Sequence, residues 1–172
     1  RDEDSKVDEL IAPNEKDEEI VEFTSAQRFI KEEYEVNELQ RAVDATGRGF
    51  DDMIKVFQNA TKHERGERVV EGAFYTRARA EGNDLGYNTI AASGSHACVL
   101  HWTRNDGTVK NGELILIDAG IEMNSYYTAD ITRTFPVNGK FTAAQRELYM
   151  LVYESQKAGF AAAKPGVTIA DI

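Results

Sequence analysis

Two acidic residues, Asp118 and Asp130, lie where the alternation of residue types predicts two neighbouring β-strands. Asp118 ends an apolar run that begins at Leu114, and alternation along a strand puts both on the same face. If the strands form a hairpin that turns around residues 123–125, with Asn124 in the left-handed conformation, Asp118 lies directly opposite Asp130. Opposed Cβ atoms are about 4.5–5.5 Å apart, so two carboxylates there repel unless cations or a shared proton lie between them.

Such a pair would support hydrolysis assisted either by metal ions or by a shared proton. Two hard divalent ions about 3.5–4 Å apart take oxygen ligands and would fit the gap. A shared proton would give a dyad like that of an aspartic protease, although the sequence has only one hydrophobic-Asp-Ala-Gly turn, at Ile117–Gly120. In the plainer interpretation an aspartate simply caps a surface turn, because Asp is common in turns. The pattern alone leaves these alternatives open.

Other reactive side chains are scattered through residues 87–102. Tyr87 and Trp102 are expected to line an apolar pocket for substrate, or else to belong to the core of a sheet. Taken alone, His101 is expected to be half-buried and bonded to the backbone, and His96 to lie in a loop near the mouth of a site. Cys98, between two apolar residues, is expected to be a buried packing residue.

The spacing of apolar residues in the elements that would position these side chains changes near residue 83, from a helical repeat to the alternation of a strand. Before residue 83, apolar residues at helical spacing predict helices, and Gly47 and Gly49 are expected to mark a close packing contact. After residue 83, short β-like runs predict an antiparallel meander. Thr142 and Gln145 have capping-box spacing at the start of a last long helix. The expected helices cover residues 20–30, 31–57, 64–80 and 142–164, and the expected strands 87–92, 97–102, 113–118, 121–127 and 130–137, with a further helix starting at 168–171.

Composition restricts the function classes. The 172 residues carry a net charge of −10, and residues 1–40 account for most of it, with 5 Lys and Arg against 14 Asp and Glu. No basic cluster suits a nucleic acid, and no apolar run is long enough to cross a membrane. A single cysteine excludes an intrachain disulfide and favours a reducing, cytoplasmic setting. We expect an α+β fold. Residues 1–30 would be an acidic linker or the end of an upstream domain, and residues 31–172 would form the α+β domain itself.

The sequence from 87 to 146 resembles the creatinase and methionine aminopeptidase ("pita-bread") family, in particular its Xaa-Pro aminopeptidase and prolidase branch. Several separate strings carry this resemblance in the right order, and the helical part from Lys31 to about Gly82 is similar to the opening of the catalytic domain. The strings are Tyr87–Ile90, Leu100–Thr103 with Asn105, Leu116–Glu122, and Thr128–Phe141 followed by Gln145–Glu147.

The resemblance implies a dinuclear metalloenzyme that hydrolyses the bond between an N-terminal residue and a following proline. Asp118 would bind one ion, Asp130 would bridge both, and His101 would contact the substrate and stabilise the oxyanion. The metal is expected to be manganese, with cobalt or zinc as alternatives. The remaining family ligands are a histidine and two glutamates, and no histidine follows Asp130 here. Residues 31–172 would therefore be the N-terminal half of the catalytic domain, inactive alone and completed by a C-terminal half.

Some alternatives stay open within this resemblance. A prolidase that acts on dipeptides, a methionine aminopeptidase or a non-enzymatic peptide-binding relative would share the fold, and a homo-oligomer is left open. Eleven residues separate Asp118 from Asp130, whereas many family members have ten. We expect a three-residue loop, with or without a bulge, to take up the extra residue.

Overall fold

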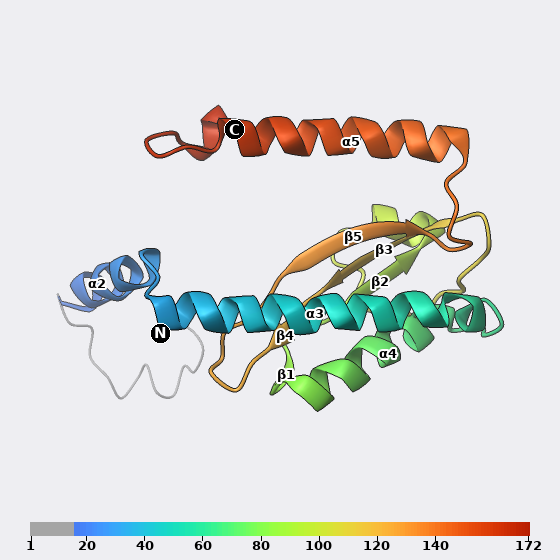
Figure 1. Ribbon diagram of the computed structural model, residues 1–172, viewed down its shortest axis with the longest axis horizontal. Helices are drawn as coiled ribbons and strands as arrows, with labels where there is room; N and C mark the ends of the chain where they lie inside the picture. Colours follow the sequence, from blue (N-terminus) through green and yellow to red (C-terminus); the bar gives the residue numbers. More distant parts are fainter. Residues whose placement is uncertain (1–15) are drawn as a thin grey trace.

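The computed structural model describes residues 16–172, which form the α+β fold that the sequence predicts (Figure 1). Residues 1–15 of the expected linker lie outside this range. The elements are α2 (Asp17–Phe29), α3 (Glu33–Ala60), α4 (Gly66–Glu81), β1 (Asp84–Leu85), β2 (Ile90–Ser93), the 3₁₀ helix η1 (Gly94–Cys98), β3 (Leu114–Ala119), β4 (Ile121–Glu122), β5 (Ile131–Pro136), α5 (Ala143–Ala162) and the 3₁₀ helix η2 (Ile169–Asp171).

An antiparallel sheet in the order β2-β3-β5 packs one face against α3 and α4. Ile115, Ile117 and Ala119 of β3 point into this core and are fully buried. The alternate residues of β3, Leu114 and Leu116, are only half-buried on the other face. Within residues 16–172, β3 is therefore fully covered on one face only.

The two long helices approach closely because a glycine faces an aromatic ring. A Cβ at Gly49 of α3 would lie 2.5 Å from the ring of Phe74 on α4, which confirms the predicted packing contact for Gly49, whereas a Cβ at Gly47 would meet nothing within 4 Å and the prediction is wrong there. Phe74 is fully buried and meets Phe50 edge to face, with the ring centroids 6.2 Å apart. This cluster fixes α3 and α4 as a platform under the sheet.

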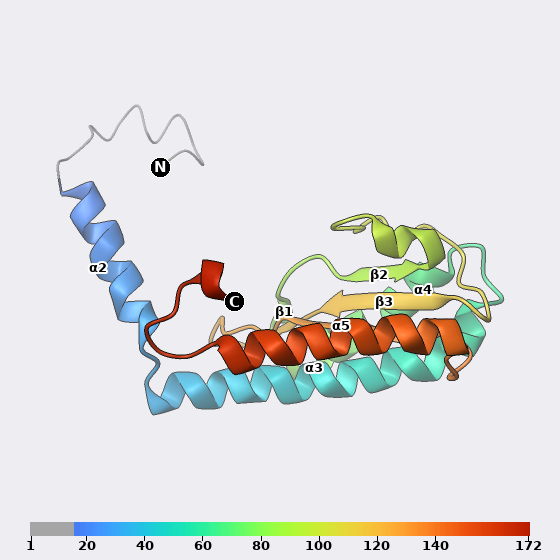
Figure 2. The same ribbon diagram turned by 90° about the horizontal axis from the view of Figure 1, so that it is seen from above.

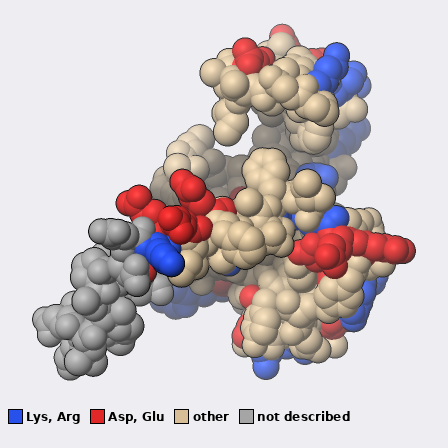
Figure 3. Space-filling model, turned by 90° about the vertical axis from the view of Figure 1, so that its left-hand side faces the viewer, with Lys and Arg blue, Asp and Glu red and all other residues tan. Residues whose placement is uncertain are grey.

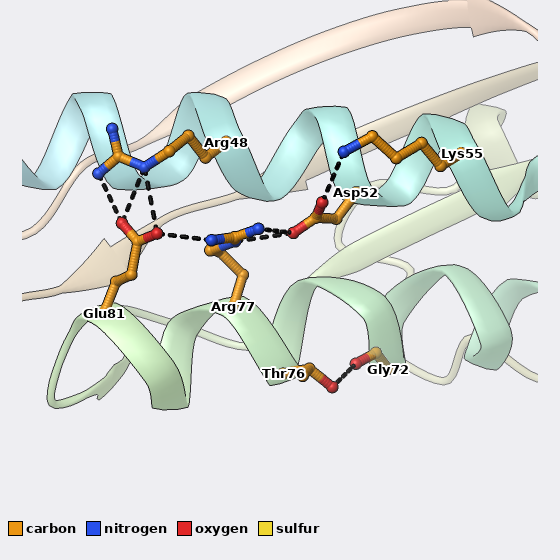
Figure 4. A network of polar contacts seen from close by, with 7 residues as sticks. All are labelled: Arg48, Asp52, Lys55, Gly72, Thr76, Arg77 and Glu81. Carbon is orange, nitrogen blue, oxygen red and sulfur yellow. Dashed lines mark hydrogen bonds and ion pairs between the residues drawn. The ribbon is translucent and has the colours of Figure 1, made fainter.

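A network of charged side chains ties the outer surfaces of α3 and α4 together (Figure 4). Arg77 of α4 pairs with Asp52 on α3 and with Glu81 one turn further along its own helix, at 2.5 and 2.6 Å. Arg48 pairs with Glu81, and Lys55 pairs with Asp52. Hydrogen bonds from Lys55 and Arg77 lower the pKa of Asp52, and the hydrogen bond from Arg48 lowers the pKa of Glu81.

We expect this network to make stability depend on pH. Because both pKa values lie below their ordinary values of 3.8 and 4.5, the network stabilises the fold above those values and loses its effect as the pH falls through the lowered pKa values. Arg77→Met should therefore lower the melting temperature at pH 7, with a smaller difference from the wild type at pH 3. Thermal unfolding followed by circular dichroism at both pH values measures this. Arg146→Met, on exposed α5, is the control, and an Arg77→Met effect of equal size at both pH values would contradict the prediction.

Helix α5 begins at the predicted capping box but buries none of its residues. The Thr142 hydroxyl accepts a hydrogen bond from the Gln145 backbone, and the Gln145 side chain accepts one from the Thr142 backbone. In Figures 1 and 2, α5 lies roughly antiparallel to α3, and Figure 1 shows that it stands apart from the body of the molecule. Its apolar residues Leu148, Leu151 and Val152 are 64–71% exposed, so this face of the helix has no covering partner within residues 16–172.

Figure 3 shows one end of the molecule, where acidic and basic side chains form several separate groups. Among the helices that the structure describes, none combines the length and the apolar character needed to cross a bilayer.

Candidate metal centre

Strands β3 and β5 form the predicted hairpin, but the predicted register is wrong by two residues. Asp118 pairs with Thr132 instead of lying opposite Asp130. The backbone N–H of Met123 bonds to Tyr127, and Tyr126, with φ 65°, takes the left-handed conformation that was expected of Asn124. The loop therefore has three residues, as expected, but its centre lies one residue later along the chain.

This shift leaves Asp118 and Asp130 as diagonal neighbours whose carboxylates still converge. The Tyr87 hydroxyl donates toward both, with its oxygen 2.6 Å from Asp118 Oδ1 and 3.0 Å from Asp130 Oδ1. The two carboxylate oxygens are thus no farther apart than the sum of these distances. Thr132 also donates to the other oxygen of Asp118, at 2.8 Å. The hydroxyl of Tyr87 thus links the two carboxylates, a contact that the sequence pattern did not predict.

The electrostatics of this site are dominated by the two acids. Burial, followed by the hydrogen bonds to Asp118 and Asp130, raises the pKa of the Tyr87 hydroxyl, which keeps its proton and serves as a donor. Neither aspartate forms an ion pair with a lysine or arginine in the part of the chain that the structure describes. Two neighbouring carboxylates without a lysine or arginine partner make this place a candidate site for a cation.

The donor set fits hard divalent ions, but it is incomplete. Carboxylate oxygens are the ligands that such ions prefer, and Asp118 and Asp130 offer them on the half-open face of the sheet. Within residues 16–172 no group of three or more His, Cys, Asp or Glu side chains could hold a metal ion. Asp118 and Asp130 alone are therefore too few to fill the coordination shell of such an ion.

Gly120 allows the two strands to approach each other between the aspartates. A Cβ at this position would overlap the carbonyl oxygen of Ala129, which lies on the opposite side of the hairpin. Gly86 donates its backbone N–H to the carbonyl of Gly120, at 2.8 Å. The backbone is therefore tightly packed at the point that sets the separation of Asp118 and Asp130.

The predicted strand at 97–102 is wrong. Gly94, with φ 58°, ends β2, and residues 94–98 form η1, followed by a turn. Cys98 is exposed and is not the buried packing residue that we expected. An apolar run alone does not decide between a strand and a short helix when a glycine reverses the chain just before it.

His101 and Trp102 lie in the segment after η1, and only Trp102 is held by its side chain. The indole N–H of Trp102 donates to Glu67, at 2.9 Å, and its ring stacks on His96 with centroids 3.9 Å apart. His101 is exposed and has φ 57°, and no hydrogen bond joins its ring to another described residue. The expected half-buried, backbone-bonded histidine is therefore not observed.

Glu67 is the residue of this region that the sequence analysis missed. Its side chain is fully buried and accepts hydrogen bonds from both backbone and side-chain donors of residues 93–107. A signal was available, because Glu67 precedes Val70, Phe74 and Ala78 at helical spacing and so occupies the buried stripe of α4. A charged residue in an apolar stripe needs partners, and a search for them leads to this segment.

Comparisons with known proteins agree with this architecture. The profile of metallopeptidase family M24 matches residues 37–172. Xaa-Pro aminopeptidase 1 of Streptomyces coelicolor is 52% identical over 157 residues, which are 91% of this chain and 32% of that protein. The Xaa-Pro aminopeptidase of Haemophilus influenzae is 42% identical over 146 residues, which are 84% of this chain and 33% of that protein. The chain thus spans about a third of the length of these relatives.

Solved structures give the same result. Zinc-substituted Escherichia coli aminopeptidase P in complex with product superimposes with a TM-score of 0.71 at 39% identity, over 83% of this chain and 32% of that chain. A Bacillus anthracis protein described as a putative aminopeptidase P gives 0.76 at 34% identity, over 84% of this chain and 34% of that chain. The fold is the pita-bread fold, seen in part. The chain therefore belongs to metallopeptidase family M24.

Proposed function

We propose that this chain forms part of an aminopeptidase that uses two divalent metal ions to hydrolyse the bond between an N-terminal residue and a following proline. The observation that carries the proposal is the convergence of Asp118 and Asp130 on one tyrosine hydroxyl, on the sheet face that α3 and α4 leave open. Membership of family M24 and relatives named Xaa-Pro aminopeptidase support the reaction class. Such an enzyme acts on peptides with proline at the second position.

Asp118 would hold one ion and Asp130 would bridge both. The other ligands, a histidine and two glutamates, would come from polypeptide outside these 172 residues, because no histidine follows Asp130 in this sequence. That polypeptide would cover the half-buried Leu114 and Leu116 beside the carboxylates, which supports its placement on this face. Manganese is the proposed metal, with cobalt and zinc as alternatives. When bound, such ions activate a water molecule and polarise the scissile carbonyl.

The side chains of this chain would position the substrate and stabilise charge. The exposed ring of His101, which has no hydrogen bond to another described residue, can donate to the oxyanion that develops on the scissile carbonyl. Tyr87 would link the carboxylates through its hydroxyl, and its ring and that of Trp102 would border the substrate. Proline lacks an N–H and has a fixed φ, so a dedicated pocket is needed beyond the scissile bond. A cytoplasmic location for the protein stays a prediction, which rests on the single cysteine.

The proposal is tested with the complete enzyme, that is, this chain joined to the polypeptide that supplies the other ligands. It should cleave Xaa-Pro-Yaa tripeptides, lose activity in a chelator and regain it with Mn²⁺. The 172-residue chain alone should be inactive, and its Mn²⁺ isotherm in calorimetry should be weak, because it offers too few ligands to displace the hydration shell of the ions.

The outcomes separate the alternatives. Activity confined to Xaa-Pro dipeptides would indicate a prolidase instead. Cleavage that persists in the chelator would refute the metal mechanism, and full peptide affinity in the chelator without cleavage would indicate a binding protein. A tight isotherm for two ions on the isolated chain would contradict the proposal that part of the centre lies elsewhere.

A further inference from the structure

A single buried carboxylate holds together both ends and the middle of the segment 93–107. Glu67 Oε1 accepts from the Ser93 backbone N–H, at 2.9 Å, and lies 2.8 Å from His96 Nδ1. Glu67 Oε2 accepts from Trp102 Nε1, at 2.9 Å, and from the Gly107 backbone N–H, at 2.7 Å. An ionised carboxylate has about four lone-pair sites, so these contacts use its whole capacity and assign the hydrogen to Nδ1 of His96.

These bonds replace the regular structure that the segment lacks. Apart from η1, residues 94–107 contain no helix or strand, so no ladder of backbone bonds fixes their path. Asn105 supplies a second buried anchor, accepting from the Ala91 backbone and donating to the Thr89 carbonyl, at 2.9 and 2.8 Å. The backbone N–H of Glu67 also bonds to the Gly107 carbonyl. The segment is thus fixed to α4 and β2 by two buried polar side chains.

His101 depends on these anchors because its own side chain is held by nothing in residues 16–172. It has a left-handed backbone, which a non-glycine residue keeps only when its neighbours enforce it. The neighbour is Trp102, whose indole is bonded to Glu67 and stacked on His96, with the Arg104 guanidinium 5.5 Å from its ring. The backbone position of His101, and so the place from which its side chain leaves the loop, therefore follows from the position of the adjacent indole.

We propose that Glu67 is a positioning residue that fixes His101 for the reaction through Trp102 and His96. This inference rests on the proposed function, in which His101 stabilises the developing oxyanion. Glu67 does not reach the reacting atoms itself, since it is fully buried beneath the segment. It acts by giving a histidine on an irregular loop one fixed place relative to the sheet, and so relative to the two aspartates.

The test is Glu67→Gln in the complete enzyme, assayed on a Xaa-Pro-Yaa peptide. The glutamine side chain keeps the volume of the glutamate but replaces one carboxylate oxygen with an NH₂ group. This group would face two N–H donors and could accept a hydrogen bond from neither, so half of the contacts of Glu67 would be lost. Since the complete loss of one oxyanion donor costs about 10²–10³ in kcat, a misplaced donor should cost about 10–100-fold, with KM changed by less than about threefold. In a His101→Ala background the same change should lower kcat by less than about twofold. Glu71→Gln, one turn along α4, is the matched control and should leave kcat unchanged.

An equal loss of kcat in both backgrounds, or a rise in KM alone, would show that Glu67 serves only the fold and would overturn the proposal. If Glu67→Gln does not fold, the variant Trp102→Phe tests the proposal, because phenylalanine keeps a stacked ring and removes only one hydrogen-bond donor to Glu67. It should lower kcat about threefold to tenfold, and only when His101 is present.

If the wild-type enzyme cleaves no such peptide, the proposed function fails. The hydrogen-exchange rates of the Ser93 and Gly107 backbone amides, which bond to Glu67, then test the anchor separately. Glu67→Gln should accelerate exchange at both amides, and unchanged rates would contradict the anchoring role.

Discussion

Replacing Asp130 by asparagine in the complete enzyme is expected to lower kcat about a thousandfold or more and to weaken the binding of both metal ions. The amide removes the negative charge and one acceptor oxygen from the position that would bridge the two ions. Charge stabilisation by such ions contributes several kcal/mol in the transition state, and each 1.36 kcal/mol is about a factor of ten in rate. Tyr87 would keep its stronger contact, the 2.6 Å bond to Asp118, so the hairpin itself should survive.

Metal content measured by mass spectrometry after dialysis, together with steady-state kinetics, checks this expectation. Asp51→Asn is the matched control. Asp51 is an exposed aspartate of α3 and does not belong to the hairpin that carries Asp118 and Asp130. The control should retain full metal content and rate. A fully active Asp130→Asn enzyme with two bound ions would show that Asp130 is not a metal ligand.

Gly120→Ala should be the most damaging single-methyl change in the hairpin. The added Cβ would overlap the carbonyl oxygen of Ala129, a backbone atom that cannot rotate away, so the two strands must separate. Overpacking of this kind costs about 1–3 kcal/mol of unfolding free energy and occasionally more. Because Gly120 lies between Asp118 and the start of β4, the same separation should misplace the carboxylates and lower kcat about 100-fold, the scale on which small misplacements act.

The matched control for Gly120→Ala is Gly72→Ala. Urea unfolding measures the stability of both variants, and steady-state kinetics measures their activity. Gly72 lies in α4, and a Cβ there meets nothing within 4 Å, so Gly72→Ala should stabilise the protein by about 0.5–1 kcal/mol. Its kinetics should not change. If both alanine variants behave alike, close packing at Gly120 does not set the geometry of the site.

The sequence predicted the helices and the face of the hairpin well because both follow from local periodicity. Apolar spacing located α3 and α4, and alternation along β3 correctly placed Asp118 on the face shared with Asp130. The register was missed because it depends on which loop residue takes a positive φ. Asn124 has the stronger intrinsic preference, yet Tyr126 takes that conformation. The hydrogen bonds of Met123 to Tyr127 and of Tyr126 to Met123 close the loop around it.

The segment 94–107 could not be predicted locally because its path is set from a distance. Ala97–Leu100 is an apolar run, and periodicity alone favours a strand there. The bonds that bend it come from Glu67, which lies 26 to 40 residues earlier in the sequence. The contacts of Tyr87 with the two aspartates are also long-range, so its role in the carboxylate pair was not visible in its own strand pattern.

The exposed thiol of Cys98 gives this protein an attachment point for a spectroscopic probe. It is the only cysteine in the sequence, so a spin label or fluorophore attaches at one position without any engineering. That position lies on η1, between the Ser93 and Trp102 contacts with Glu67. A label there would report directly, through its tumbling rate, how firmly the histidine-bearing loop is attached to the helix beneath it.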